Sequence, residues 1–424
     1  MSNSFVKEDL TAYEEILEEF TDNLVMSKLV KKYTINDTRA ERANNTVNRP
    51  MPYVAQSYSG TDATANFNGA TQLSVPATIG YQRHCAFLMT SLEYRDALQE
   101  KRLGEAVGQK LASDINLAVT NVICNQASLV VKRTAGATGY DDVALADSIM
   151  NEQGINSIGR KLALNSRDYN SMAGNLASRQ TMTGKPADAY ERSSVGMVAG
   201  FDTYKLDYSA LLLASTASGV TINGANQYYV PSAMSTAITG ETSPKDNRFQ
   251  NIVLSVTSGI VKAGDCFTIA GVNAVHHITK QDTRQLKTHR IIAQVSGTTG
   301  GSGTYTISPP LISGQGGSSA ELAYQNVSAT PANGAVVTFL NTATTQVNPF
   351  WVENSIELIP GRHIPPTDAG AAIHQGQTEQ GGIQLTMQKQ YDVRTMNTLI
   401  RWDVFFGVVN LQPEMNGIIL FNQV

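Results

Sequence analysis

The residues that come nearest to a metal site form two short pairs, one of two histidines and one of a histidine and a cysteine. His276 and His277 are adjacent, and His84 directly precedes Cys85. Adjacent side chains of a strand point to opposite faces, which is a poor geometry for sharing one ion, and neither pair has a third ligand nearby in the sequence. Such pairs are more often ordinary core or surface features than ligand sets. We therefore expect no metal and no cofactor.

Other catalytic patterns are incomplete. The segment 297–303 (GTTGGSG) is rich in glycine but lacks the Gly-Lys-Ser/Thr ending and the following helix of a phosphate-binding loop. Because it precedes a predicted strand, Thr304–Ser308, a flexible hairpin tip explains it better. No nucleophile elbow occurs, and no pair of carboxylates lies between apolar flanks as a tuned acid and base would. The sequence therefore predicts that the protein is not an enzyme.

Length and composition favour a large protein with extended contact surfaces. A chain of 424 residues is expected to form two or three domains. Charged residues make up only 16% and the formal net charge is −4, which disfavours sequence-reading DNA binding, since that usually needs a basic protein. Three scattered cysteines (Cys85, Cys124 and Cys266) indicate reduced thiols. No signal peptide and no membrane-spanning run are expected.

The stretch from Thr90 to about Val131 predicts one long helix that would support the other parts. Thr90 and Glu93 have the spacing of a capping box. Gly104 and Gly108 are poor helix formers, so a bend or a close backbone contact is expected there. Apolar residues recur every three or four positions along one stripe: Leu92, Leu103, Val107, Leu111, Ile115, Val119, Val122 and Ile123.

A second amphipathic helix is predicted over residues 5–33. Its apolar positions alternate at spacings of three and four, and acidic residues crowd its first part while lysines close it, in the order that suits the helix dipole. A solvated face on a packed helix is the simpler interpretation. The alternative is a mobile arm whose acidic face docks a basic partner.

Strands are predicted on both sides of these helices. Residues 57–72 carry almost no large aliphatic side chain, so the hairpin that they would cap should lie on something else, most simply a neighbouring subunit. From about Gly219 to Asn348 short β-branched runs alternate with turns, which is typical of a small antiparallel barrel or sandwich. The predicted strands include Asn251–Thr257, Cys266–Ile269, Arg290–Val295, Ala335–Leu340, Phe350–Leu358, Ile383–Lys389 and Asn397–Val409.

The order of these parts resembles the major coat protein of short-tailed double-stranded DNA phages of the Lederbergvirus type, which is built on the Hong Kong 97 phage-capsid fold. Stretches similar to that family include Asn45-Thr46-Val47, Met51–Val54, Tyr94-Arg95 and Lys110–Ala112. The strongest likeness lies in the family's inserted domain, with Gly219–Ala225, Asp246–Phe249, Lys262–Asp265 and Ile269–Val272 in the right order, closed by Asn348–Trp351.

The resemblance implies an α+β fold with a long spine helix, an extended hairpin loop and an inserted antiparallel β-barrel domain. It divides the chain into an N-terminal arm (1–47), the extended hairpin loop (48–82), a peripheral domain with the spine helix (83–134), the first part of an axial domain (135–219), the inserted β-barrel domain (220–348), the second part of the axial domain (349–396) and returning strands of the peripheral and axial sheet (397–424).

The function that the resemblance implies is that of a major capsid protein. Copies would form pentamers and hexamers of an icosahedral head, with assembly guided by a scaffolding protein. A portal protein and packaged double-stranded DNA, held by weak non-specific contact, would be further partners, and no membrane would be involved. The protein would be assembled in the bacterial host cytoplasm and reside in the virion.

Two groups of charged residues are the candidate contacts. On the loop 235–248, the resemblance implies inter-capsomer contacts, and the candidates are Glu241, Lys245, Asp246 and Arg248. For Asp246 and Arg248, a local role in a turn and a strand start is an open alternative. On the arm, the candidates for scaffold docking are Glu14, Glu15 and Glu18. Some relatives of the fold crosslink subunits through lysine and asparagine, but no lysine lies between Arg49 and Arg83, so no such bond is expected.

Two other functions compete with a shell subunit. A phage tail or adhesin-like binding protein would use the β-domain to recognise a surface ligand, but its loop tips should be rich in aromatic residues, and those here are poor in Trp and Tyr. A hydrolase with a β-insert would need a nucleophile pattern, and the sequence offers none.

Overall fold

The structure is a computed structural model, and it describes residues 7–33, 45–90, 93, 97–178, 184–364, 372–378 and 382–424. The chain forms two compact units. The first is built from Met1–Val47, Ala77–Thr120 and Ile356–Val409, and the second from Asn48–Pro76, Asn121–Ser355 and Asn410–Val424. None of the helices in the described ranges is long and apolar enough to cross a membrane.

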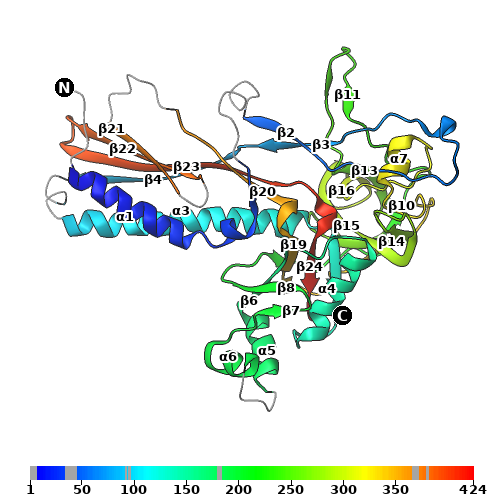
Figure 1. The fold of residues 1–424 in the computed structure, drawn as a ribbon, viewed down its shortest axis with the longest axis horizontal. Coiled ribbons are helices and arrows are strands. Elements are labelled where there is room, and N and C mark those ends of the chain that lie inside the picture. The colour runs from blue at the N-terminus through cyan, green and yellow to red at the C-terminus, as the bar shows by residue number, and fades with distance from the viewer. Residues whose placement is uncertain are drawn as a thin grey trace. The chain divides into compact units, whose positions relative to one another are not determined.

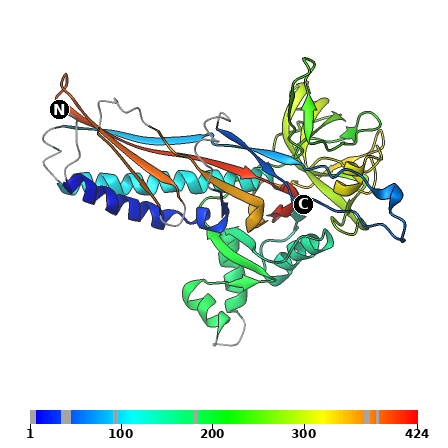
Figure 2. The same cartoon turned by 45° about the horizontal axis from the view of Figure 1, so that its top comes forward.

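The first unit packs two helices on one sheet. Helix α1 (Lys7–Asn23) lies alongside helix α3 (Ala97–Gln126) in both views (Figures 1 and 2). The strands run in the order β1-β20-β23-β22-β21, and β4 pairs with β23. Their bounds are β1 Lys31–Lys32, β4 Tyr81–Thr90, β20 Ile356–Pro360, β21 Ala372–Gln377, β22 Gln384–Asp392 and β23 Asn397–Asn410. A short 3₁₀ helix, η1 (Met26–Leu29), follows α1, so the predicted helix over residues 5–33 was too long.

The long helix is shorter than predicted at its C-terminal end. It stops at Gln126, and Leu129–Lys132 forms strand β5 instead of a last helical turn. A short apolar run with β-branched residues fits a buried strand as well as a buried helix, and here pairing with β24 decides. The Thr90–Glu93 contact is confirmed: the backbone N–H of Thr90 donates to the Glu93 carboxylate over 2.9 Å. Leu92 and Tyr94-Arg95 lie outside the described residues.

Gly104 and Gly108 mark where α1 meets α3. A Cβ on Gly104 would lie 2.2 Å from Ile16 Cδ1, and one on Gly108 would lie 3.3 Å from the Ile16 carbonyl oxygen. Only glycine lets the neighbouring chain approach so closely. The prediction of a close contact at these glycines is therefore confirmed.

The second unit contains a mixed sheet in the order β5-β24-β19-β6-β8-β7. Its core joins Leu162, Phe201 and Phe350 from the strands to Met150 and Met172 from the helices. The predicted strand Phe350–Leu358 is in fact two strands separated by the 3₁₀ turn η4 (Glu353–Ser355). The bounds are α4 Tyr140–Glu152, β6 Arg160–Asn165, α5 Ser166–Ala177, α6 Lys185–Arg192, β7 Met197–Val198, β8 Phe201–Leu206, β19 Asn348–Val352, η5 Pro413–Met415 and β24 Asn416–Leu420.

The inserted domain is an antiparallel barrel, as predicted. Its strands run in the order β10-β13-β16-β15-β14-β17, and a bridge between Thr221 and Val336 joins the two ends of the sheet. The glycine-rich segment is the turn between β15 and β16, where Gly297 pairs with Gly303. The strands are β10 Thr221–Ile222, β13 Gln250–Ser255, β14 Cys266–Val275, β15 Asp282–Gly297, β16 Gly303–Ser308 and β17 Val337–Phe339; helix α7 spans Ser319–Tyr324, and β9 (Leu211–Leu212) pairs with β18 (Thr345–Gln346) where the chain enters and leaves.

Two further hairpins complete the described chain. Strands β2 (Thr46–Pro50) and β3 (Ser74–Thr78) form a two-stranded sheet, and the long connection between them contains only one short 3₁₀ turn, η2 (Thr64–Asn66). Strands β11 (Met234–Thr236) and β12 (Thr242–Pro244) form a separate hairpin that projects from the inserted domain (Figure 1).

Candidate assembly surfaces

The arm helix α1 is anchored on the sheet by polar contacts as well as apolar ones. The Tyr13 hydroxyl accepts a hydrogen bond from the Gly376 backbone over 2.7 Å and donates to the Leu385 carbonyl. Burial raises the pKa of the Tyr13 phenol well above its usual value. Nearby, Lys389 Nζ lies 2.9 Å from the Asp9 carboxylate, and both side chains are largely buried. These contacts hold the helix in one orientation.

The opposite face of α1 is acidic and exposed. Glu14, Glu15 and Glu18, the three residues predicted to dock a scaffold, are all exposed, and Asp22 continues the same stripe one turn further on. Because Tyr13, Ile16 and Phe20 point into the core, the 3.6-residue period places these acids outward. The helix therefore presents several carboxylates on one anchored surface.

The β11–β12 hairpin has no buried face. All six strand residues are exposed, and the register pairs Ser235 with Ser243. At its turn Gly240 has φ +88°, and Glu241 is exposed. Part of the predicted loop 235–248 is therefore a regular antiparallel strand pair.

The structure separates the four candidate charges of this loop. Arg248 Nη2 lies 2.7 Å from Asp246 Oδ2, and the Arg248 backbone N–H donates to Asp246 Oδ1 over 3.0 Å. Arg248 also donates to the Asn410 carbonyl. Lys245 Nζ sits 4.5 Å from the centroid of the Tyr229 ring, while Glu241 stands apart at the turn. The local role left open for Asp246 and Arg248 is thus present, as a turn closed by an ion pair.

The extended loop contacts the inserted domain of its own chain. Tyr324 Oη donates to the Thr71 carbonyl over 3.0 Å, and Ser74 forms a backbone bridge with Asp246. Leu73 and Val75, at the end of the loop, are buried. The sequence predicted support from a neighbouring subunit; within the single chain the support comes from the inserted domain.

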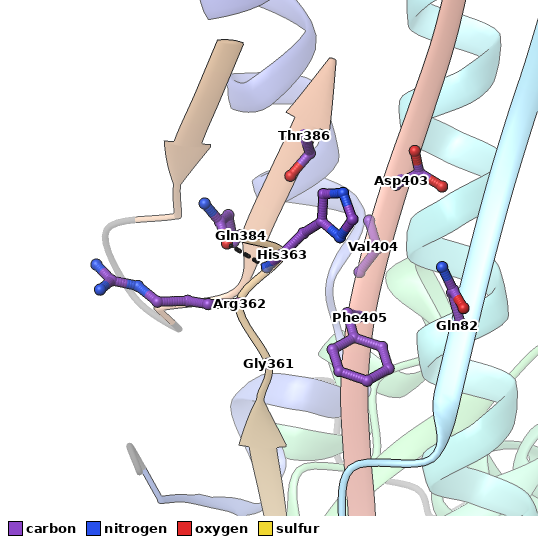
Figure 3. Close-up of a pocket in the computed structure, with 9 residues that line it drawn as sticks. All are labelled: Gln82, Gly361, Arg362, His363, Gln384, Thr386, Asp403, Val404 and Phe405. Atoms are coloured by element: carbon purple, nitrogen blue, oxygen red, sulfur yellow. Dashed lines mark hydrogen bonds between the residues drawn. The ribbon is translucent and has the colours of Figure 1, made fainter. Parts of the chain in front are cut away.

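A small polar cavity of about 190 Å³ opens on the outer face of the sheet in the first unit (Figure 3). The His363 backbone donates to Gln384 Oε1, and Arg401 donates to Asp403 Oδ1, so two of the polar groups are already paired. The cavity shows His363 and Asp403 but no activated nucleophile. Its chemistry is limited to hydrogen bonding.

A buried charge cluster links the inserted barrel to the sheet of the second unit. Lys287 is fully buried in β15, and its ammonium lies 2.9 Å from the Glu414 carboxylate. Asn326 also donates to Glu414. Burial alone would raise the pKa of Glu414, but the Lys287 and His277 charges lower it to about 2. The sequence did not predict this cluster, because its members lie far apart along the chain.

The profile of the family described as "P22 coat protein - gene protein 5" matches residues 1–422.

The chain belongs to this coat-protein family.

Several solved structures are similar to the coat protein. One from Mycobacterium phage Che8 shares 9% identity over 95% of this chain and 92% of that chain, with a TM-score of 0.42. The capsid of the cyanophage P-SCSP1u shares 10% identity over 95% of this chain and 89% of that chain, with a TM-score of 0.46. The CUS-3 coat protein I-domain shares 40% identity over 30% of this chain and 99% of that chain, with a TM-score of 0.23.

Membership of the family settles the class of function. The coat protein is the major capsid subunit of a phage head, assembles with its own copies into an icosahedral shell, and belongs to the capsid of the virion; it is not an enzyme. The predicted α+β class with an inserted antiparallel barrel is confirmed.

The histidine pairs of the coat protein serve structure. His276 Nδ1 accepts hydrogen bonds from the backbone N–H groups of Ile278 and Thr279. His276 therefore closes the turn after β14 and does not lie on a strand. Burial lowers the pKa of His277 to about 4, against the opposing pull of Glu414. His84 and Cys85 are neighbours on strand β4, opposite Asp403 and Trp402.

Proposed function

We propose that the coat protein assembles as pentamers and hexamers around packaged double-stranded DNA, and that a scaffolding protein guides assembly by docking on α1. The single observation that carries the scaffold contact is the acidic stripe of Glu14, Glu15 and Glu18 on a helix whose other face is anchored. Such a surface suits a basic helix of a partner, because opposite charges steer the encounter and fix its orientation.

The test reverses the charge of the stripe. The triple variant Glu14→Lys, Glu15→Lys, Glu18→Lys should lower the amount of scaffolding protein that cosediments with shells and raise the fraction of aberrant particles in negative stain. Glu191→Lys, which changes an exposed acid on α6, is the matched control. If the triple variant assembles with scaffold as the parent does, the docking proposal fails.

The second part of the proposal gives the β11–β12 hairpin a contact between capsomers. Glu241, Lys245, Asp246 and Arg248 remain its candidate charges. An exposed ion pair contributes only ~0–1 kcal/mol, but repetition around a closed shell adds the contributions. Replacing the turn Ala237–Glu241 by two glycines should leave the subunit folded and reduce the yield of closed shells; an unchanged yield would contradict this part.

The remaining partners belong to the same proposal. A portal protein at one vertex is proposed from the resemblance to the family. Contact with DNA should be weak and non-specific, because a subunit with a net charge of −4 has no strongly basic composition. The seven-part division of the chain given above, from the arm (1–47) to the returning strands (397–424), is proposed on the same footing.

A further inference from the structure

The second unit contains a cavity of about 490 Å³ that the proposed function does not use. Its walls come from the extended loop, the rim of the barrel and the turn before β24, and they are mostly apolar. Leu73, Ile155, Ile278, Ile312 and Met415 are examples. A cavity of this size and character is typical of a binding site, when a few polar groups converge on it. We call it the rim cavity.

One polar group in the rim cavity lacks a matching charge. Lys280 Nζ donates a hydrogen bond to the Gln325 carbonyl oxygen over 3.1 Å. Burial lowers the pKa of Lys280 to about 8, although Glu414 pulls it upward. Glu414 is already bound to Lys287 and Asn326. An incoming carboxylate would therefore find a partly desolvated ammonium whose nearest acid is engaged elsewhere.

The β11–β12 hairpin carries a complementary tip. Ile238 has a relative exposure of 108%, so its own chain covers none of it. Glu241, three residues later at the same turn, is also exposed. Isolated exposed apolar residues need no explanation in general. This one stands at the turn of a projecting hairpin, together with a carboxylate, whereas the Glu414 carboxylate of the rim cavity is engaged by Lys287.

The hairpin and the rim cavity share a border. Asn247 and Arg248 follow the hairpin directly and also line the rim cavity. An extended chain advances ~3.3 Å per residue, so the strands hold Ile238 on the order of 15–20 Å from this border. Two copies facing each other across a two-fold axis would exchange tips reciprocally, as an isologous contact requires.

We propose that the hairpin tip of one copy inserts into the rim cavity of a second copy, with Ile238 against Ile278 and Met415 and with Glu241 toward Lys280. The inference rests on the proposed inter-capsomer role of the hairpin and names its receptor. It makes the contact mainly apolar, with one ion pair, instead of a set of surface charges.

Disulfide trapping in assembled shells tests the contact. In a Cys85→Ala background, the double variant Ile238→Cys, Ile278→Cys should give covalently linked dimers on non-reducing denaturing gels after oxidation, because a reciprocal exchange closes each pair of copies. Each single variant should give none, since Cys124 and Cys266 are buried and only the partly exposed Cys85 has to be replaced. Ile260→Cys with Ile278→Cys is the matched control, because Ile260 is another exposed apolar residue of the inserted domain. A linked dimer from Ile238→Cys alone would place two tips together and overturn the proposal.

Charge exchange tests the ion pair separately. Glu241→Lys and Lys280→Glu should each lower the yield of closed shells several-fold, and the double variant should restore it. Lys280→Met serves as a second variant if Lys280→Glu unfolds the subunit, and it should lower the yield with the melting temperature of the free subunit unchanged. No restoration in the folded double variant would count against the pair.

The outcomes separate this inference from the proposed function. If replacing the turn leaves shell yield unchanged, the inter-capsomer role of the hairpin is wrong, and the inference falls with it. If the replacement blocks closure but the Ile238–Ile278 pair gives no linked dimer, the hairpin binds a neighbour elsewhere and only the rim cavity is excluded.

Discussion

The arm helix α1 and the β11–β12 hairpin are both candidate contact surfaces, but they are held in opposite ways. Helix α1 buries Tyr13, Ile16 and Phe20, and a buried ion pair fixes it. All strand residues of the hairpin are exposed, and its most apolar turn residue, Ile238, is uncovered. The arm is therefore specified by its own chain, whereas the hairpin buries no apolar strand or turn residue within that chain.

The comparison predicts the largest difference between two apolar truncations. Phe20→Ala should destabilise the free subunit by ~3–5 kcal/mol, because Phe20 is fully buried and leaves a cavity. Ile238→Ala should leave the free subunit within about 0.5 kcal/mol of the parent, as surface substitutions usually do. Urea unfolding of the free subunit measures both. A large loss for Ile238→Ala would mean that the tip packs within its own chain.

The two regions also differ in their ion pairs. Lys389→Met leaves the carboxylate of Asp9 buried without its cation, which should cost about 3 kcal/mol. Lys110→Met, in the exposed pair with Asp114 on α3, is the matched control and should cost less than ~1 kcal/mol. Equal losses for the two variants in thermal unfolding would show that α1 is not anchored through Asp9.

The sequence predicted those parts whose signals are local. Helix α1 was predicted because its apolar residues recur at helical spacing, although the predicted range 5–33 was too long. The barrel followed from β-branched runs between turns. The C-terminal end of the long helix was wrong because pairing with a strand almost 290 residues later decides the conformation of Leu129–Lys132.

The contacts between distant segments could not be predicted. Lys287 lies in the barrel and Glu414 in the turn before β24, far apart along the chain. Neither residue type suggests a buried partner from the sequence. The candidate acids of α1 were found because helical periodicity gives their face directly. For Asp246 and Arg248 a local turn was left open beside the inter-capsomer contact that the resemblance implied, and only the local turn can be seen in one chain.

Tyr13 should make the contribution of the α1 anchor to stability depend on pH. Its folded pKa is raised, first by burial, so its contribution is complete below pH ~10, the value in the unfolded chain, and is lost as the pH rises toward the folded pKa. Tyr13→Phe should cost about 1 kcal/mol at pH 7 through the lost hydrogen bonds and should flatten the fall in stability above pH 10. The difference between parent and variant, followed by urea unfolding from pH 8 to 11, isolates Tyr13 from the other tyrosines.

The smallest effect is expected at the base of the hairpin. Asp246→Asn removes the charge of the partly buried pair with Arg248, in which the Asp246 and Arg248 side chains are 25% and 10% exposed, but keeps an acceptor for the Arg248 backbone, so the free subunit should lose only about 1 kcal/mol. Glu241→Gln, at the turn, should cost the free subunit less still, because Glu241 is exposed there. If Asp246 acts only locally, the yield of closed shells should follow the stability of the free subunit when Asp246→Asn is compared with the parent. A loss of closed shells from Asp246→Asn at unchanged subunit stability would instead assign Asp246 to the contact between capsomers.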